Sequence, residues 1–281
     1  MIYGQKKNVR MCPTRHEADA ADAAVVSGLN LVLWSTLNWT ARRVGRGAAY
    51  ASRWAARLRN KRMEKKSIGH RLIIEWGKPL DSTGYLHKYG GLPSNRASLP
   101  LCQGCKKPFH LLLQIDLADP DLTYLELPVL DFLFLFTCLN CASYEEVMYY
   151  RLNNGAQQIV VLRQTPGVYV GEYSVPLEEQ KLSHRLLKEN EYPKTKEDER
   201  RLLSQERKHQ LGGAPLWIQD VEHISCLECG NEMEYIAMVD TELYIGEDGF
   251  RERGHMFGDS GTFYTFVCRE CGLFASHAQG L

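Results

Sequence analysis

DFLFLFTCLNC (residues 131–141) and GTFYTFVCREC (residues 261–271) are two versions of one pattern in this chain of 281 residues. In each version an apolar, aromatic-rich run leads directly into a Cys-x-x-Cys pair. Phe132, Phe134 and Phe136 alternate with other apolar residues in the first, and Phe263 belongs to the second. Apolar residues at both alternating sets of positions predict pleated strands that are covered on both faces.

The similarity extends upstream from these two strands. An offset of 124 residues places Cys102 on Cys226, Cys105 on Cys229 and Asp116 on Asp240. An offset of 122 places Gly90, Gly91 and Pro93 on Gly212, Gly213 and Pro215. Each first Cys-x-x-Cys pair precedes a strand-like run, FHLLLQID (109–116) or MEYIAMVD (233–240). The chain therefore contains an internal repeat, with a Cys-x-x-Cys pair on either side of a long β segment in each copy.

Eight of the nine cysteines fall into two sets of four. The sets are Cys102, Cys105, Cys138 and Cys141, and Cys226, Cys229, Cys268 and Cys271. A two-residue spacer lets a tight turn present both sulfurs to one ion, and tetrahedral zinc takes four thiolates at about 2.3 Å. The gaps between pairs, 32 and 38 residues, exceed the ~15–20 residues of compact zinc modules, which we attribute to inserted strands. The spacing predicts two structural zinc ions, each without an open coordination position.

Three other uses of the cysteines fit this pattern less well. A redox pair of the thioredoxin type lies at a strand-to-helix turn, whereas each first pair here precedes a strand, and one redox pair does not account for four. Disulfides need an oxidising compartment, and the polar residues 1–22 do not resemble a secretory signal. Buried cysteines without a metal have no reason to recur in paired spacing. Cys12 lies outside the pattern and is interpreted as incidental.

Other polar residues are weaker candidates for function. His223, His255 and His277 lie near the second cysteine set in sequence and could replace a ligand or line a pocket, but surface or hydrogen-bonded histidines are the simpler interpretation. Asp116 and Asp240 could form a pair for acid–base chemistry, although duplication at strand ends explains their recurrence. The chain has no phosphate-binding glycine loop, Gly-x-Ser-x-Gly or His-Glu-x-x-His motif. We therefore expect no enzyme activity and assign no catalytic or cofactor-binding residue.

The middle of the chain predicts strands followed by helices. EEVMYYRL (145–152) and QQIVVLRQ (157–164) are typical of strands joined by a turn at Asn153-Asn154-Gly155. Residues 176–210 are strongly charged, with Leu at helical intervals, and are interpreted as two helices broken near Tyr192-Pro193. This segment is either a solvated connector or a helix that binds a partner. Trp217, after the second Gly-Gly pair, is expected in the core or lining a pocket.

Residues 1–62 differ from the rest in composition. They hold twelve Lys and Arg but three acids, a formal charge of +9, and because the whole chain has formal charge zero the remainder carries −9. One interpretation is a dispensable, disordered or helical extension upstream of a native start at Met63. The alternatives are a basic amphipathic helix that binds a membrane surface or nucleic acid, and a mitochondrial presequence. No segment is long and apolar enough for a convincing membrane span.

The glycine, strand and cysteine phrases together carry a resemblance. GGLP with CQGCKKPFHLLLQIDL, and LGGAPLWIQD with CLECGNEMEYIAMVD and GDSGTFYTFVCREC, resemble the bacterial YwqG-like family across residues 64–281. That resemblance implies an α+β fold of duplicated β-rich halves, and some relatives are thought to be immunity proteins beside toxins. A weaker resemblance, in GG-x-P before Cys-x-x-Cys, is to programmed-cell-death-2-like zinc ribbon proteins, which are thought to act as chaperones. No catalytic residue carries over from either family.

These observations predict an α+β protein with four segments. They are the basic extension 1–62, a first β-rich repeat with a zinc ribbon at 63–175, a charged helical connector at 176–210, and a second such repeat at 211–281. We expect a cytoplasmic, non-catalytic protein-interaction module, with immunity to a toxin as one role. The formal charge of −9 on residues 63–281 favours a basic protein partner, since complementary charge speeds the encounter of two proteins. Nucleic acid is a less favoured partner, because Lys106 and Lys107 form the one compact basic spot beside a Cys-x-x-Cys pair.

Overall fold

The structure is a computed structural model. It describes residues 68–80, 84–127, 130–141, 146–153, 155–167, 172–205, 209–245, 252–255, 257 and 260–280. The basic segment 1–62 and the proposed start at Met63 lie outside these residues. Residues Lys66–Leu281 form one compact unit. None of the helices among the described residues is long and apolar enough to cross a membrane.

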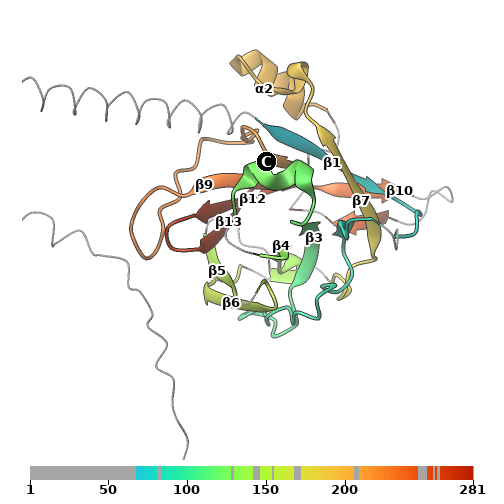
Figure 1. Ribbon diagram of the computed structural model, residues 1–281, viewed down its shortest axis with the longest axis vertical. Coiled ribbons are helices and arrows are strands. Elements are labelled where there is room, and N and C mark those ends of the chain that lie inside the picture. Colours follow the sequence, from blue (N-terminus) through green and yellow to red (C-terminus); the bar gives the residue numbers. More distant parts are fainter. Residues whose placement is uncertain are drawn as a thin grey trace, which may run out of the picture. The chain divides into compact units, whose positions relative to one another are not determined.

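One large sheet organises this unit (Figure 1). It has 11 strands in the order β4-β3-β2-β7-β1-β8-β9-β12-β13-β5-β6, and all named strand pairs are antiparallel. Its strands are β1 (Gly69–Glu75), β2 (Lys88–Tyr89), β3 (His110–Asp116), β4 (Phe132–Thr137), β5 (Met148–Asn153), β6 (Gln158–Arg163), β7 (Gln180–Leu186), β8 (Gln210–Gly212), β9 (Glu234–Asp240), β12 (Gly261–Cys268) and β13 (Leu273–Gly280). A separate hairpin pairs β10 (Glu242–Ile245) with β11 (Glu252–His255).

The repeat seen in the sequence is also a repeat in hydrogen bonding. The strand order β4-β3-β2-β7 is mirrored by β12-β9-β8-β1, with β7 and β1 paired at the centre. Leu182 N–H donates to His87 O at 3.3 Å, and Leu72 N–H donates to His209 O at 2.9 Å. The first of these bonds joins β7 to the start of β2, and the second joins β1 to the start of β8. The two copies thus have the same local backbone geometry about a pseudo-twofold centre.

The Gly-Gly pairs are required by this geometry. Gly90 and Gly91 have φ of 66° and 68°, and Gly212 and Gly213 have φ of 67° and 69°. A Cβ on Gly90 would lie 2.4 Å from Glu178 O, a contact that no side chain tolerates. Glycine is therefore needed for both the left-handed conformation and the close backbone approach.

The halves are not separate bodies, because one hairpin crosses between them. β5 and β6 follow β4 in sequence, yet β5 pairs with β13 of the second half. The sheet curls, so that the β6 end returns toward the β4 end (Figure 1). Isolated parallel bridges join Leu130 to Gly155 and Ser98 to Gln158 across this gap.

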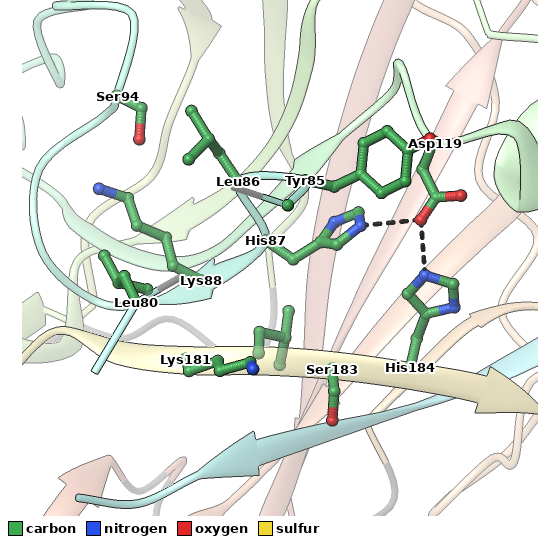
Figure 2. A pocket seen from close by; sticks show the side chains of 12 residues that line it. Leu80, Tyr85, Leu86, His87, Lys88, Ser94, Asp119, Lys181, Ser183 and His184 are labelled. Carbon is green, nitrogen blue, oxygen red and sulfur yellow. Dashed lines mark hydrogen bonds and ion pairs between the residues drawn. The ribbon is translucent and has the colours of Figure 1, made fainter. Parts of the chain in front are cut away.

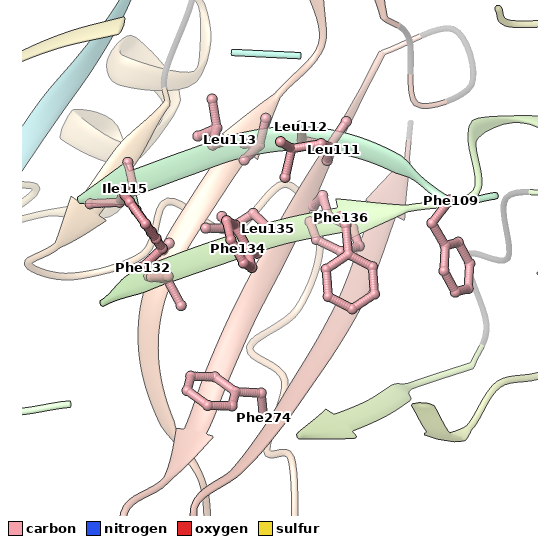
Figure 3. Close-up of a cluster of buried hydrophobic side chains, with 14 of the residues drawn as sticks. Phe109, Leu111, Leu112, Leu113, Ile115, Phe132, Phe134, Leu135, Phe136 and Phe274 are labelled. Carbon is pink, nitrogen blue, oxygen red and sulfur yellow. The ribbon is translucent and has the colours of Figure 1, made fainter. Parts of the chain in front are cut away.

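The interior of the curl is the main core (Figure 3). Phe134 and Phe136 of β4 and Leu111 and Leu113 of β3 are completely buried. In Figure 3, Phe274 of β13 lies across from these two strands. Burying a side chain of this size contributes about 1.5–3 kcal/mol, so this cluster is a main source of stability.

The expected α+β class is wrong, because the regular secondary structure of the described residues is mostly antiparallel β, with little helix. The charged segment 176–210 is not a helical connector: its first part is β7, in the middle of the sheet, and α2 (Lys196–Leu203) is the one α-helix among the residues that the structure describes. The other helical elements in this part of the chain are short 3₁₀ turns, η1 (Pro120–Leu125), η2 (Leu139–Cys141) and η3 (Glu189–Glu191). β7 alternates inward Gln180, Leu182 and His184 with outward polar residues, so its charge reflects one solvated face.

The other strand predictions are confirmed. The runs 109–116, 233–240, 131–141 and 261–271 contain β3, β9, β4 and β12, and the predicted hairpin in 145–164 is β5–β6. The boundaries 63–175, 176–210 and 211–281 stay a prediction of the sequence. Trp217 is packed in the second core cluster, with its ring 4.7 Å from that of Tyr264.

Candidate metal centres

The eight predicted ligands come together in two clusters. In site 1 (Cys102, Cys105, Cys138, Cys141) and site 2 (Cys226, Cys229, Cys268, Cys271) the four sulfurs lie within 4.8 Å of one another. The Cys105 and Cys138 sulfurs are 3.6 Å apart, and those of Cys229 and Cys268 are 3.7 Å apart. A tetrahedral ion with metal–sulfur distances of about 2.3 Å places its sulfurs about 3.8 Å apart. Both clusters are geometrically suited to bind one metal ion.

Each first pair is held in a tight turn by the same backbone bonds. Lys106 N–H donates to Cys102 O and Gly230 N–H donates to Cys226 O, both at 3.0 Å. The residue after the second cysteine is left-handed in both turns, with φ of 61° at Lys106 and 71° at Gly230. These hydrogen bonds join residues that are close together in sequence. The Cys-x-x-Cys spacing by itself therefore determines the direction in which both cysteine side chains point.

Each second pair is positioned by the first residue of the adjacent strand. In site 1, Leu139 N–H donates to His110 Nδ1 at 3.2 Å. In site 2, at the equivalent place, Arg269 Nε donates to Glu234 Oε2 at 3.1 Å. Arg269 also donates to the backbone oxygens of Leu125 and Glu126, at the end of η1. Such contacts around a metal site fix the ligands before the ion binds.

The four thiols of a cluster cannot all ionise without a cation. Burial raises the pKa of Cys138, and it raises the pKa of Cys141 and of Cys268 to about 11. Burial acts in the same sense on Cys102, but hydrogen bonds from Gln164 and from backbone N–H groups outweigh it and lower the pKa of Cys102 to about 7. A hydrogen bond from Asn231 lowers the pKa of Cys229. Metal binding would therefore release protons from the buried thiols.

The two sites differ in how they are covered. Over site 1, Gln164 Nε2 donates to Cys102 Sγ at 3.3 Å and Gly167 N–H donates to Cys141 O at 3.3 Å. Pro166 lies against Gly104, where an added Cβ would come within 2.8 Å of it. At site 2, Gly230 and Gly272 each follow a cysteine and have open space where a Cβ would be. Site 1 is therefore capped by residues 164–167, and site 2 has no equivalent cap among the described residues.

Their surroundings also differ in charge. Lys106 and Lys107 are exposed beside site 1. Around site 2 the acids outnumber the bases, and they are Glu228, Glu232, Glu234 and Glu270. Arg151 pairs with Glu228, and Arg269 pairs with Glu234. Site 2 therefore lies in an acidic surface.

None of the three nearby histidines belongs to a cysteine cluster. His223 is exposed and pairs with Glu232 at 2.8 Å. His255 is completely buried, 3.1 Å from Tyr89 OH, and burial lowers its pKa to about 3. His277 is buried, and burial lowers its pKa. Asp116 and Asp240 lie at equivalent strand ends, where each backbone N–H donates to a histidine, His87 or His209.

Those two histidines were missed in the sequence. Each begins a phrase, HKYGGLP or HQLGGAP, that repeats with the same offset of 122 as the glycines. His87 Nε2 lies 3.0 Å from Asp119 Oδ2, and His209 Nε2 lies 3.0 Å from Glu242 Oε2. The repeated His-x-x-Gly-Gly phrase was the available signal, whereas the carboxylates occupy less regular positions.

His87, Asp119 and His184 form a third group of potential metal ligands. His87 argues against a metal there, because its Nδ1 accepts the Asp116 N–H at 3.1 Å, which leaves its proton on Nε2. That proton is donated to Asp119, so Nε2 offers no lone pair to an ion. Burial raises the pKa of Asp119, but hydrogen bonds from Asp121, His184 and His87 outweigh it and lower the pKa. We assign this group as a hydrogen-bonded network around a buried carboxylate.

A scan against protein-family models and a search of curated proteins both return no match for this chain. Its interpretation therefore depends on the geometry described above.

Proposed function

We propose that this protein is a non-catalytic, two-zinc β protein that acts by binding another protein. The observation that carries the proposal is the pair of Cys₄ clusters, each closed by two tight Cys-x-x-Cys turns. Four thiolates at tetrahedral spacing suit zinc, and a site with four protein ligands leaves no position for a reacting water. Both ions would have a structural role.

The positions of the clusters support that role. Each cluster ties the end of one strand to the turn before another, at β4 and β3 for site 1 and at β12 and β9 for site 2. Metal binding to structural zinc sites supplies about 10–16 kcal/mol of apparent free energy, which is comparable to the whole stability of a domain. Zinc would thus hold the two halves in their folded form.

Metal analysis tests this proposal. The purified protein should contain two equivalents of zinc per chain, and removal of zinc by a strong chelator should abolish the native far-UV circular dichroism spectrum. Cys102→Ser and Cys226→Ser should each lose one equivalent. A protein with far less than two equivalents, free thiols and an intact fold after chelation would contradict the proposal.

The proposed partner is a basic protein, for which a cationic toxin is the example that the resemblance implies. The −9 charge of residues 63–281 and the acidic surroundings of site 2 support this partner. Affinity capture with residues 63–281 should retain basic proteins that dissociate as salt is raised. Capture of acidic proteins alone, or of nucleic acid at physiological salt, would argue for a different role.

A further inference from the structure

A pocket of about 230 Å³ opens beside β7, but its polar groups are partnered within the chain. Asp119 Oδ2 accepts from His87 Nε2 at 3.0 Å and from His184 Nε2 at 2.8 Å (Figure 2). The Lys88 ammonium is ion-paired at 2.7 Å, and Lys181 extends away from it in Figure 2. The remaining lining consists of Leu80, Gly84, Tyr85, Leu86, Ser94, Leu182 and Ser183. These polar groups therefore do not converge on one ligand.

The second metal site presents an exposed surface outside this pocket. Five exposed residues of its two Cys-x-x-Cys turns, which we call the site 2 face, are Leu227, Glu228, Asn231, Glu232 and Glu270. Leu227 is 44% exposed, and Asn231 Nδ2 donates to Glu270 Oε2 at 3.1 Å, which joins the two turns. Single exposed apolar residues are common on protein surfaces, so the significance of Leu227 depends on a comparison with site 1.

The first Cys-x-x-Cys turns of the two sites have the same backbone. Gly104 N–H donates to Cys102 Sγ at 3.3 Å, and Glu228 N–H donates to Cys226 Sγ at 3.5 Å. An antiparallel bridge closes each turn at equivalent residues. A segment that lies across one turn would therefore meet the same backbone groups on the other.

At site 1 the chain itself supplies such a segment. Gln103 N–H donates to Gln164 Oε1 at 3.0 Å, and Gly167 N–H donates to Cys141 O at 3.3 Å. Residues 164–167 belong to no helix or strand. A short irregular segment is thus sufficient to cover the turn and use its backbone groups.

The same backbone donor of site 2 is left open. Leu227 occupies the position of Gln103, and none of the described residues accepts its N–H. Cys271, the last cysteine of site 2, is partly buried, whereas Cys141 in site 1 is only 6% exposed. A segment from another protein has both an exposed N–H and an exposed apolar side chain to contact here.

The two turns carry opposite charge at equivalent positions. Residues 103–108 contain Lys106 and Lys107, a formal charge of +2, and residues 227–232 contain Glu228 and Glu232, a formal charge of −2. The backbone of the turn is the same, but a segment that covers site 2 meets acids. It should therefore be basic, unlike the neutral residues 164–167.

Much of this acidic charge is not neutralised within the chain. Glu228 pairs with Arg151, but Glu232 pairs with the exposed imidazole of His223, and Glu270 accepts from a neutral amide. Neither Glu232 nor Glu270 has an ion pair with a Lys or Arg in the described part of the chain. Lys and Arg side chains of a partner would complement these two carboxylates.

We propose that the site 2 face binds a short basic segment of a partner protein, placed across the turn as residues 164–167 are placed across site 1. An oxygen of the segment would accept the Leu227 N–H, an apolar side chain would contact Leu227, and basic side chains would approach Glu232 and Glu270. This inference rests on the proposed function and names the surface through which the basic partner binds.

Titration of the full-length, metal-containing protein with two peptides tests the proposal. The basic peptide has the sequence of residues 161–167 with Pro166→Lys, and the acidic peptide has Arg163→Glu and Pro166→Glu. The basic peptide should change the ¹H–¹⁵N amide shifts of residues 226–232 and bind at least tenfold more tightly than the acidic one. Equal affinities, or no shift changes in residues 226–232 at 10 mM basic peptide, would overturn the proposal.

Variants with matched controls test the individual contacts. Glu232→Lys should weaken binding of the basic peptide at least tenfold, and Leu227→Ser at least fivefold. Glu197→Lys makes the same charge change at an exposed position of α2, and Gln103→Ser changes the equivalent position of site 1. Both controls should bind within twofold of the native protein, and all four variants should keep its metal content. A loss in Glu197→Lys equal to that in Glu232→Lys would show that net charge alone attracts the peptide, against the proposal.

Affinity capture separates a failure of this inference from a failure of the proposed function. The native protein should retain basic proteins that Glu232→Lys and Leu227→Ser do not retain. Retention of the same basic proteins by all three would reject the site 2 face but keep a basic partner. Retention of none by the native protein would reject the proposed function, and the inference with it. Shift changes in residues 226–232 when the protein alone is concentrated would identify a second copy of the chain as the occupant, which also contradicts the proposal.

Discussion

Single residues in this protein are constrained chiefly by backbone approach and by buried charge. The left-handed glycines before each metal site are one example, and the ion pairs between β1, β7 and η3 are another. Arg185 donates two hydrogen bonds to Glu191, at 2.7 and 3.0 Å, and Arg71 Nε donates a third. Both kinds of constraint can be tested with single substitutions.

Gly90→Ala should destabilise the protein far more than Gly77→Ala. Both glycines have positive φ, 66° and 74°, so both substitutions bear the left-handed strain of about 1–2 kcal/mol. A Cβ at Gly90 also meets Glu178 O at 2.4 Å, whereas nothing lies within 4 Å of a Cβ at Gly77. We expect a loss above about 3 kcal/mol for Gly90→Ala, measured by urea unfolding. Equal losses in the two variants would show that the backbone approach is unimportant.

Glu191 should make the fold sensitive to acid. Hydrogen bonds from Arg185 lower the pKa of Glu191 from 4.5 to about 2. A lowered folded-state pKa stabilises the fold above pH 4.5, and this contribution disappears as the pH falls from about 4.5 to 2. Between pH 6 and 3 the native protein should lose about 1–2 kcal/mol more stability than Glu191→Gln, after allowance for solvent screening. Parallel pH profiles of unfolding free energy would contradict this role.

At the scale of elements, the two metal turns are alike in backbone and unlike in surroundings. The residues that cap site 1 come from the segment after β6, whereas the strand that follows site 2, β13, lies within the sheet between β12 and β5. The cap of site 1 depends on how residues 164–167 fold back over the cysteines. The two copies therefore differ in their caps, although their Cys-x-x-Cys turns are the same. This difference should appear in the kinetics of metal loss.

Site 2 should release its metal before site 1. A chromophoric chelator in excess should reveal two phases, because residues 164–167 hinder access to site 1 and Gly230 and Gly272 leave site 2 open. Gln164→Ala removes the hydrogen bond to Cys102 Sγ and should accelerate the slow phase alone. Cys226→Ser should eliminate the fast phase. A single phase in the native protein, or a slow phase untouched by Gln164→Ala, would refute the ordering.

At the scale of the whole molecule, the β5–β6 hairpin links the two halves. It leaves the first half after site 1 and pairs with β13 of the second half, and Tyr149 OH donates to Ser225 O beside site 2. Arg269 crosses in the opposite direction, from site 2 to the end of η1. Neither half contains all the partners of its own strands.

The described unit should therefore unfold in one step. In urea, far-UV circular dichroism and tryptophan fluorescence should give coincident transitions, because Trp76, which follows β1 and packs against the main core, and Trp217, which packs against the second core cluster, belong to the same cooperative structure. Residues 63–175 alone should lack a native spectrum. Two separated transitions, or a folded 63–175 fragment, would show that the halves are independent.

The sequence by itself determined the members of the two cysteine clusters, the repeat and most strands, because these depend on short-range spacing: two residues within a turn, alternation along a strand. Only the tertiary structure decided that residues 180–186 form a central strand. A strand with one solvent-exposed face can carry as many charged residues as an amphipathic helix, so charge does not distinguish the two. The tertiary structure also decided that β5 pairs with β13, and that Lys88, Asp119 and Lys181 line a pocket. These features join segments far apart in the chain, and local spacing contains no information about which distant segment supplies the partner.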